Sequence, residues 1–241
     1  MIVGVLQADS VLAQFQEKHG NYPEMFRRTL GRVDPGVEFK DYNVELGEYP
    51  SNLDDCDGYV ITGSKKSVYD DEPWIQHLSD FVRALHDRRK KMVGICFGHQ
   101  MVAHVLGGKT EPARQGWGVG IHQYQIITKH DFMRPGADEF GLLASHKDQV
   151  TELPDDAELL ATSKFCPNAM FRIGEHILTF QGHPEFTREY ARDLMQMRAE
   201  TLGEDIFQAG IASLQHGLHG ELVSQWIIRF IDGSGHAPTS A

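Results

Sequence analysis

The segment Gly94-Ile95-Cys96-Phe97-Gly98-His99-Gln100 constrains the fold of this chain most strongly, because it joins two kinds of backbone within a few residues. The apolar run before it, residues 91–95, is typical of a buried strand, and the pattern of residues 100–106 is typical of a helix. A sharp strand-to-helix turn has little room for side chains two residues before and two after its central residue. We therefore predict that Gly94 and Gly98 permit a tight turn that raises the Cys96 sulfur above a sheet.

The helix that follows Cys96 gives this position a chemical character. The first N–H groups of a helix have no partners within the helix, and the helix dipole places positive charge at the same end. Both effects favour a thiolate over a thiol and help to hold a developing oxyanion. A buried, inert cysteine is the alternative interpretation, and the paired glycines argue against it. Cys96 is therefore our candidate nucleophile.

The composition is that of an ordinary globular protein and excludes several classes of function. Hydrophobic residues make up 41% and charged residues 24% of the 241 residues. A net charge of -11 argues against nucleic-acid binding, which requires clustered lysine and arginine. No apolar run is long enough to span a bilayer, and no targeting segment is recognisable, so we expect a cytoplasmic protein that does not bind membranes. Three cysteines favour reduced thiols over a disulfide framework.

The pattern along the chain predicts one α/β domain over residues 1–231 and a disordered tail over residues 232–241. We expect strands over residues 2–6, 37–46, 56–62 and 91–95, covered on both faces by helices such as the one that begins at Pro73. Later short strands, over residues 117–127, 158–162, 169–172 and 177–180, predict a partly antiparallel extension of a mostly parallel sheet. A helix capped by Thr187 is expected to run to Met197, and the rest of the domain is helical in pattern. Its apolar residues 222, 223, 226, 227 and 230 form either a packing face or a partner surface, and packing is the commoner outcome.

A second motif, Gly182-His183-Pro184-Glu185, supplies what a cysteine nucleophile needs. Side chains two residues apart on an extended segment point the same way, and Pro184 holds His183 in an extended conformation. The Glu185 carboxylate is therefore expected to reach the His183 ring and to fix its orientation. We predict His183 as general base and acid, and Glu185 as its orienting carboxylate.

With both motifs in this order, the sequence resembles the class I, triad-type glutamine amidotransferases over roughly its first 200 residues. The resemblance implies a flavodoxin-like α/β fold, with an open, mostly parallel sheet and Cys96 at its C-terminal edge. It also implies hydrolysis of the γ-glutamyl amide of glutamine through a thioester on Cys96, with release of ammonia.

The resemblance assigns further residues one at a time. Gly63 matches the oxyanion loop of the family. The resemblance implies that its backbone N–H and that of Phe97 together hold the oxygen of the tetrahedral intermediate. Gln100 matches the residue that binds the amino-acid end of the substrate. Ser145 and His146 belong to a Ser-His-x-Asp-x-Val stretch that lines the same pocket in the family. We expect no metal and no cofactor.

The destination of the ammonia is open at this point. No acceptor module is recognisable in the sequence, so one interpretation is a glutaminase that works with a separate synthase subunit. A second is a free-standing hydrolase of γ-glutamyl conjugates, because the motif around Cys96 is also similar to that of γ-glutamyl peptidases. A third is a catalytically idle binding or regulatory protein on the same fold.

Overall fold

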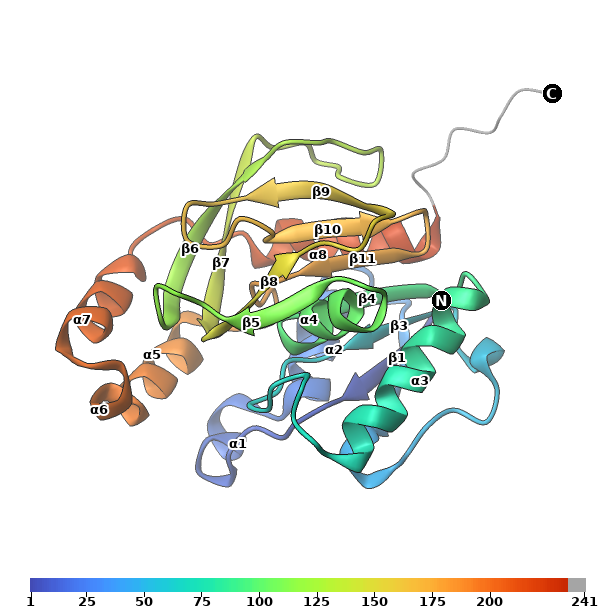
Figure 1. The fold of residues 1–241 in the computed structure, drawn as a ribbon, viewed down its shortest axis with the longest axis horizontal. Coiled ribbons are helices and arrows are strands. Elements are labelled where there is room, and N and C mark those ends of the chain that lie inside the picture. The colour runs from blue at the N-terminus through green and yellow to red at the C-terminus, as the bar shows by residue number, and fades with distance from the viewer. Residues whose placement is uncertain (234–241) are drawn as a thin grey trace.

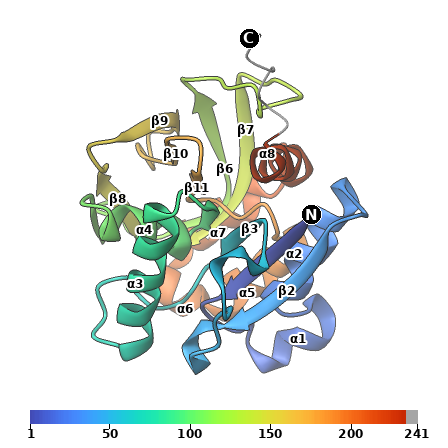
Figure 2. The same cartoon turned by 90° about the vertical axis from the view of Figure 1, so that its right-hand side faces the viewer.

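The computed structural model describes residues 1–233, which form a nine-stranded sheet with helices on both faces (Figures 1 and 2). Five strands at one side are parallel, in the spatial order β2 (Glu38–Asn43), β1 (Ile2–Gln7), β3 (Gly58–Ile61), β4 (Lys91–Ile95) and β11 (Ile177–Phe180). Antiparallel strands continue the sheet as β10 (Met170–Ile173), β9 (Ala157–Thr162), β6 (Gly118–Ile126) and β7 (Glu139–His146). The predicted flavodoxin-like architecture with an antiparallel extension is confirmed.

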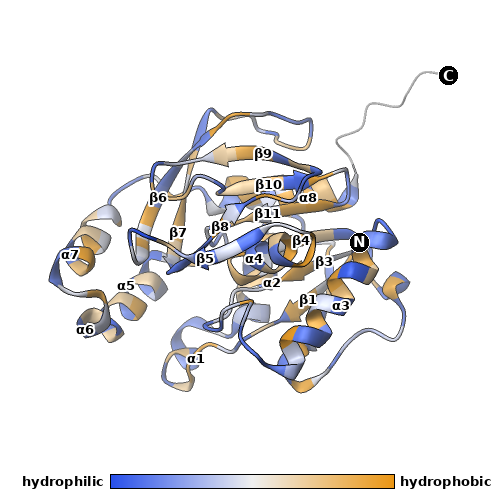
Figure 3. Ribbon diagram, viewed as in Figure 1, coloured by the Kyte–Doolittle hydropathy of each residue, from blue (hydrophilic) through white to orange (hydrophobic). Residues whose placement is uncertain are grey.

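The parallel strands are covered on both faces because their side chains alternate between two apolar cores. Val3, Val93 and Leu178 pack in one core with helices α2 (Tyr22–Val33) and α8 (Gly220–Asp232). Met92 and Ile177 face the opposite core, with α3 (Pro73–Asp87) and α4 (Phe97–Val105). Figure 2 shows these two pairs of helices on opposite sides of the sheet. Figure 3 shows apolar and polar bands alternating along α3, as a helix with one buried face requires.

A third apolar core lies beyond the antiparallel strands. There α5 (Arg188–Met197) and α7 (Glu204–Ser213) pack against the hairpin of β6 and β7, and the short α6 (Ala199–Leu202) connects them (Figure 1). The predicted Thr187 cap is confirmed, since its side chain accepts a hydrogen bond from the Tyr190 N–H. In α8, the side chains of Val223, Trp226, Ile227 and Phe230 are buried in the protein's own core, so the packing interpretation holds there.

Several predicted boundaries were wrong. The strand expected over residues 37–46 ends at Asn43, where a 3-10 turn (Val44–Leu46) begins, because the Asn43 side chain accepts from the Leu46 N–H. A second such turn spans Leu53–Asp55. The predictions from sequence omitted α1 (Ala13–His19), β7 and the two-stranded sheet of β5 (Lys109–Pro112) and β8 (Asp148–Glu152).

The helix α8 extends to Asp232, the first residue of the predicted tail. Residues 234–241 of the predicted tail lie outside the described residues. Within residues 1–233, none of the helices has the length and apolar character that a membrane span requires.

Candidate active site

Cys96 stands at the turn between β4 and α4 with an unusual backbone conformation. Its φ is 51° and its ψ is −99°, a region that residues other than glycine seldom occupy. The flanking glycines are sterically required. A Cβ on Gly94 would lie 2.5 Å from the Gly98 carbonyl oxygen, and one on Gly98 would lie 2.6 Å from the Ile61 carbonyl oxygen. The predicted tight turn, with two glycines that permit it, is confirmed.

The pairing of β11 with β4 brings a distant part of the chain to Cys96. The Cys96 N–H donates to the Phe180 carbonyl at 2.8 Å, at the end of β11. The chain then runs on to His183, whose N–H donates to the Leu143 carbonyl of β7 at 2.8 Å. A parallel strand pair thus places the cysteine and the histidine at the same edge of the sheet, although they are far apart in the sequence.

His183 and Glu185 are in direct contact. The His183 Nδ1 lies 2.7 Å from Glu185 Oε1, and the two residues are only 2% and 1% exposed. The Phe186 ring stacks on the imidazole with a centroid distance of 3.8 Å and an interplanar angle of 12°. With Nδ1 engaged by the carboxylate and one ring face covered by Phe186, the orientation of the imidazole is fixed.

Negative charge controls the protonation of His183. Burial disfavours the imidazolium, but interactions with the Glu185 carboxylate and with Cys96 outweigh it and raise the pKa of His183 to about 10. The ring therefore carries a proton at neutral pH. A buried cation between a carboxylate and a cysteine sulfur can stabilise a thiolate and later give up its proton.

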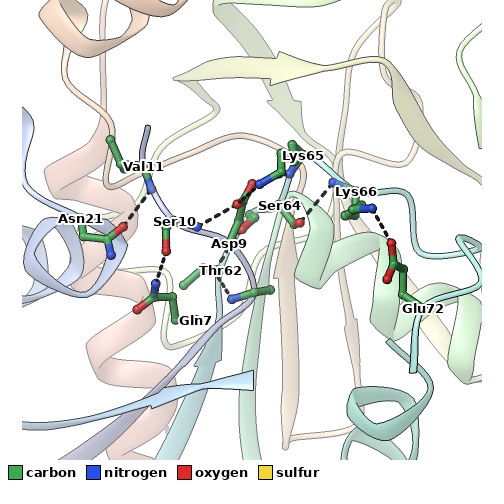
Figure 4. A network of polar contacts seen from close by, with 12 residues as sticks. Gln7, Asp9, Ser10, Val11, Asn21, Thr62, Ser64, Lys65, Lys66 and Glu72 are labelled. Carbon is green, nitrogen blue, oxygen red and sulfur yellow. Dashed lines mark hydrogen bonds and ion pairs between the residues drawn. The ribbon is translucent and has the colours of Figure 1, made fainter. Parts of the chain in front are cut away.

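The loop after β3 lies directly against both residues. A Cβ on Gly63 would lie 2.8 Å from His183 Cε1 and 3.7 Å from the Cys96 Cβ. Polar contacts with the loop after β1 hold this segment in place, as Figure 4 shows. The Asp9 carboxylate accepts from the backbone N–H and from the Nζ of Lys65, and Thr62 Oγ1 accepts from the Ala8 N–H. The backbone of Gly63 is therefore held close to Cys96 and His183.

The side chain of Gln100 is buried beside this turn. Its Nε2 donates to the Asp148 carbonyl at 2.7 Å and to Gln181 Oε1 at 3.2 Å. Because these bonds use both N–H groups, its oxygen is the group left to accept a hydrogen bond. The Oδ2 of Asp148 accepts from Ser67 and Tyr69, while its Oδ1 is buried without a partner among the described residues.

The other two predicted pocket residues lie at the end of β7. The Ser145 hydroxyl accepts a hydrogen bond from Arg198 Nη1 at 2.8 Å. His146 is buried, with its Nδ1 3.1 Å from the Asp148 carbonyl, and burial lowers the pKa of His146 to about 3. His146 is therefore neutral at physiological pH. It cannot supply a positive charge to a ligand.

A cavity of about 130 Å³ opens at Cys96 and brings most of these residues together. Cys96, Gln100, Ser145, His146 and His183 all line it. Lys147 and Asp148, from the predicted Ser-His-x-Asp-x-Val stretch, line it as well. The lining residues that sequence reasoning did not select are Asp9, Tyr22, Ser64, Lys65, Lys66, Ser67, Trp117, Phe186, Tyr190, Leu194 and Arg198. One signal was available, because residues 190 and 194 recur at the spacing of one face of the predicted helix, and residues 186 and 198 continue the interval of four beyond its two ends. Within residues 1–233, no group of three His, Cys, Asp or Glu side chains is arranged to hold a metal ion.

The architecture and the cysteine turn identify the class of protein. Residues 17–199 match the family model described as glutamine amidotransferase class-I. The chain belongs to the class-I glutamine amidotransferase family.

Individual relatives cover most of the chain. Gamma-glutamyl peptidase 3 of Arabidopsis thaliana is 36% identical over 73% of this chain and 74% of its own length. The glutamine-hydrolysing GMP synthase subunit of Methanothermobacter thermautotrophicus is 30% identical over 71% of this chain and 88% of its own length. Among solved structures, a glutamine amidotransferase from Thermotoga maritima has a TM-score of 0.74 at 20% identity and covers 96% of this chain and 97% of its own. That last similarity supports the fold.

Proposed function

We propose that this protein is a cysteine hydrolase that cleaves γ-glutamyl amide bonds through a thioester on Cys96. The observation that carries the proposal is the arrangement at the edge of the sheet. A cysteine held at positive φ on a strand-to-helix turn shares a cavity with a histidine whose Nδ1 lies 2.7 Å from a buried carboxylate. Membership of the family supports the assignment.

In the proposed mechanism, the Cys96 thiolate attacks the γ-carbonyl carbon and forms a tetrahedral intermediate. The N–H of Phe97, the first residue of α4, has no partner within its helix, and it acts together with the N–H of Gly63 to hold the oxyanion. His183 gives its proton to the departing amine, which leaves a γ-glutamyl thioester on the sulfur. His183 then takes a proton from water, the hydroxide attacks the thioester carbonyl, and glutamate and the thiolate are released.

Electrostatics favours this sequence of steps. Glu185 stabilises the imidazolium, so the acid that protonates the leaving group is in place before the substrate arrives. Gln100 has its amide nitrogen fixed by Asp148 and Gln181, which makes its oxygen a fixed acceptor for the α-ammonium group of the substrate. Ser145 and His146 complete this wall of the cavity.

Two substrate classes fit the proposed chemistry. Glutamine would release ammonia, and the relative named as a glutamine-hydrolysing GMP synthase component supports this candidate, with a separate synthase chain for a partner. γ-Glutamyl peptides would release a peptide, and relatives named gamma-glutamyl peptidase at 33–36% identity support that candidate. Because these relatives share more sequence identity, γ-glutamyl peptides are our first choice. The chain would then act without a synthase partner.

The nucleophile is tested by substitution and by labelling. Cys96→Ala should reduce release of glutamate from glutamine and from γ-glutamyl peptides by at least a thousandfold, because the thioester cannot form. An electrophilic glutamine analogue should add its mass to Cys96 in the wild type. Cys56→Ala is the matched control, since Cys56 is another buried free thiol and does not line the cavity.

Turnover that survives in Cys96→Ala would refute the assignment. A wild-type chain that neither turns over any γ-glutamyl compound nor takes the label would favour the idle binding protein. Rates on peptides that exceed those on glutamine, with no partner present, would support the peptidase. Glutaminase activity that rises only with an added synthase chain would support the other candidate.

A further inference from the structure

Arg198 brings a positive charge to the cavity that no carboxylate of the described residues neutralises. Lys147, which also lines the cavity, has no ion pair among residues 1–233 either, but it is exposed, whereas Arg198 is partly buried. The two remaining cations around the cavity are neutralised. Lys65 forms an ion pair with Asp9 at 2.7 Å, and Lys66 pairs with Glu72. Within residues 1–233, no Asp or Glu lies within ion-pair distance of Arg198, although the residue is only half-exposed. A guanidinium keeps its charge at every physiological pH, so this charge is available to a ligand.

Neutral groups hold the Arg198 side chain in place. Its Nη1 donates to the Ser145 hydroxyl at 2.8 Å, and its guanidinium carbon lies 5.4 Å from the centre of the Trp117 ring. A hydroxyl and an aromatic face fix the position of a guanidinium without cancelling its charge. The remaining N–H groups of the fork are free to bind another acceptor. Planar carboxylates match that fork with two parallel hydrogen bonds.

The position of Arg198 connects it to the proposed catalytic histidine. Phe186, which stacks on His183, is followed at intervals of four residues by Tyr190, Leu194 and Arg198, and all of them line the cavity. Tyr190 and Leu194 lie four residues apart on one face of α5. Phe186 comes directly before the Thr187 cap, and Arg198 comes directly after the last residue of the helix. One wall of the cavity thus runs from the imidazole along α5 to the guanidinium.

We propose that Arg198 binds a carboxylate of the substrate, a role that rests on the γ-glutamyl hydrolase activity proposed above. A γ-glutamyl peptide carries two carboxylates that fit this chemistry. One is the α-carboxylate of the glutamyl group, and the other is the C-terminal carboxylate of the departing peptide. A two-residue leaving group would place its terminal carboxylate about 7 Å beyond the scissile bond. Arg198 is therefore a specificity-determining residue of the cavity.

Binding to the inactive Cys96→Ala variant tests this role without turnover. Dissociation constants are measured by calorimetry for γ-glutamyl-alanyl-glycine, for its C-terminal amide and for its α-carboxamide. With Arg198 present, one of the two neutralised peptides should bind at least tenfold more weakly than the parent. Adding Arg198→Met should weaken the parent at least tenfold and remove that difference, because the two changes delete the same contact. The peptide that loses affinity identifies the carboxylate.

Two further variants give controls. Arg192→Met removes an exposed cation of the same helix that does not line the cavity, and it should keep the wild-type pattern of affinities. Arg198→Lys keeps the charge but loses the fork, so it should recover part of the difference. If neither neutralised peptide binds more weakly, if the difference persists in Arg198→Met, or if no peptide binds, the role of Arg198 is refuted.

The outcome is separable from that of the proposed function. The wild type could hydrolyse these peptides while the difference in affinity between the acid and the amide peptides stays the same in Arg198→Met. That result would refute only the role of Arg198. Conversely, the difference in affinity could depend on Arg198 although the wild type hydrolyses none of these peptides. That result would refute only the proposed hydrolase activity.

Discussion

At the scale of single residues, His183 is the most constrained group of the site. Glu185 holds its Nδ1, Phe186 covers one face of its ring, and Gly63 leaves just enough space at Cε1. The last contact gives Gly63 a steric reason to lack a side chain, beyond the N–H that we assign to the oxyanion hole. A ring held in this way can act only toward the cavity that it shares with Cys96.

The raised pKa of His183 leads to a prediction about pH dependence. The Glu185 carboxylate stabilises the protonated ring, so the folded-state pKa of about 10 should fall when Glu185 is replaced by Gln. The proton would then be lost at a lower pH. The alkaline limb of the kcat/KM profile for a γ-glutamyl substrate should therefore move downward by roughly one pH unit or more in Glu185→Gln.

Asp148→Asn is a suitable control for that profile, since Asp148 lines the cavity while its carboxylate bonds to Ser67 and Tyr69. The alkaline limb of the kcat/KM profile of Asp148→Asn should stay at the wild-type pH, even if the value of kcat/KM changes. An unchanged limb in Glu185→Gln would contradict the role of the carboxylate.

Part of the geometry of the candidate site could be predicted from the sequence, for physical reasons that particular residues illustrate. The glycine spacing around Cys96 reports a local steric need, and the spacing of His183 and Glu185 reports the geometry of one extended segment, so both can be read from a short stretch. Arg198 could not be found in this way. Its importance depends on its having no nearby carboxylate among the described residues, which is a property of the folded molecule.

At the scale of elements, α5 connects the histidine motif to one wall of the cavity. It begins directly after Thr187, whose side chain accepts from the Tyr190 N–H at 3.1 Å. This cap was predictable because Thr is a common N-cap residue before a helical pattern. The strand β7 was not predicted, although it pairs with β6, the strand that directly precedes it in the chain.

Loss of this cap should cost stability. Thr187→Ala leaves the Tyr190 N–H without its acceptor and should lower the free energy of unfolding by about 1 kcal/mol. Thr187→Ser keeps the oxygen and should restore most of that loss. Urea denaturation of both variants measures the difference, and equal stability of Thr187→Ala and the wild type would show that the cap is unimportant.

At the scale of the whole molecule, α8 closes the core behind the parallel strands. Trp226 is fully buried, packs edge-on against Phe140 and donates from its Nε1 to the Pro135 carbonyl at 2.9 Å. The C-terminal helix thus joins the parallel and antiparallel halves of the sheet. Its apolar pattern was visible in the sequence, but only the fold shows that this chain covers it.

Truncation of this side chain should destabilise the entire domain. Trp226→Ala should lower the free energy of unfolding by about 3–5 kcal/mol, because it opens a large cavity and removes the hydrogen bond to Pro135. Trp226→Phe should lose less. Thermal and urea unfolding check both values. Trp74→Ala is the comparison, because Trp74 is only partly buried at the start of α3 and its truncation should lower the free energy of unfolding by less. Equal decreases at the two positions would contradict the role of Trp226.

The pairing of β11 with β4 also determines the point in folding at which the candidate site is complete. Cys96 belongs to the first half of the chain, but its histidine arrives only after β11 has been added to the sheet. Pairings between segments so distant in sequence form slowly, because the intervening chain must first be ordered. On the ribosome, a growing chain therefore displays its cysteine long before it holds the base. The candidate site is therefore assembled late, in the second half of the folding of the sheet, and not as each strand is made.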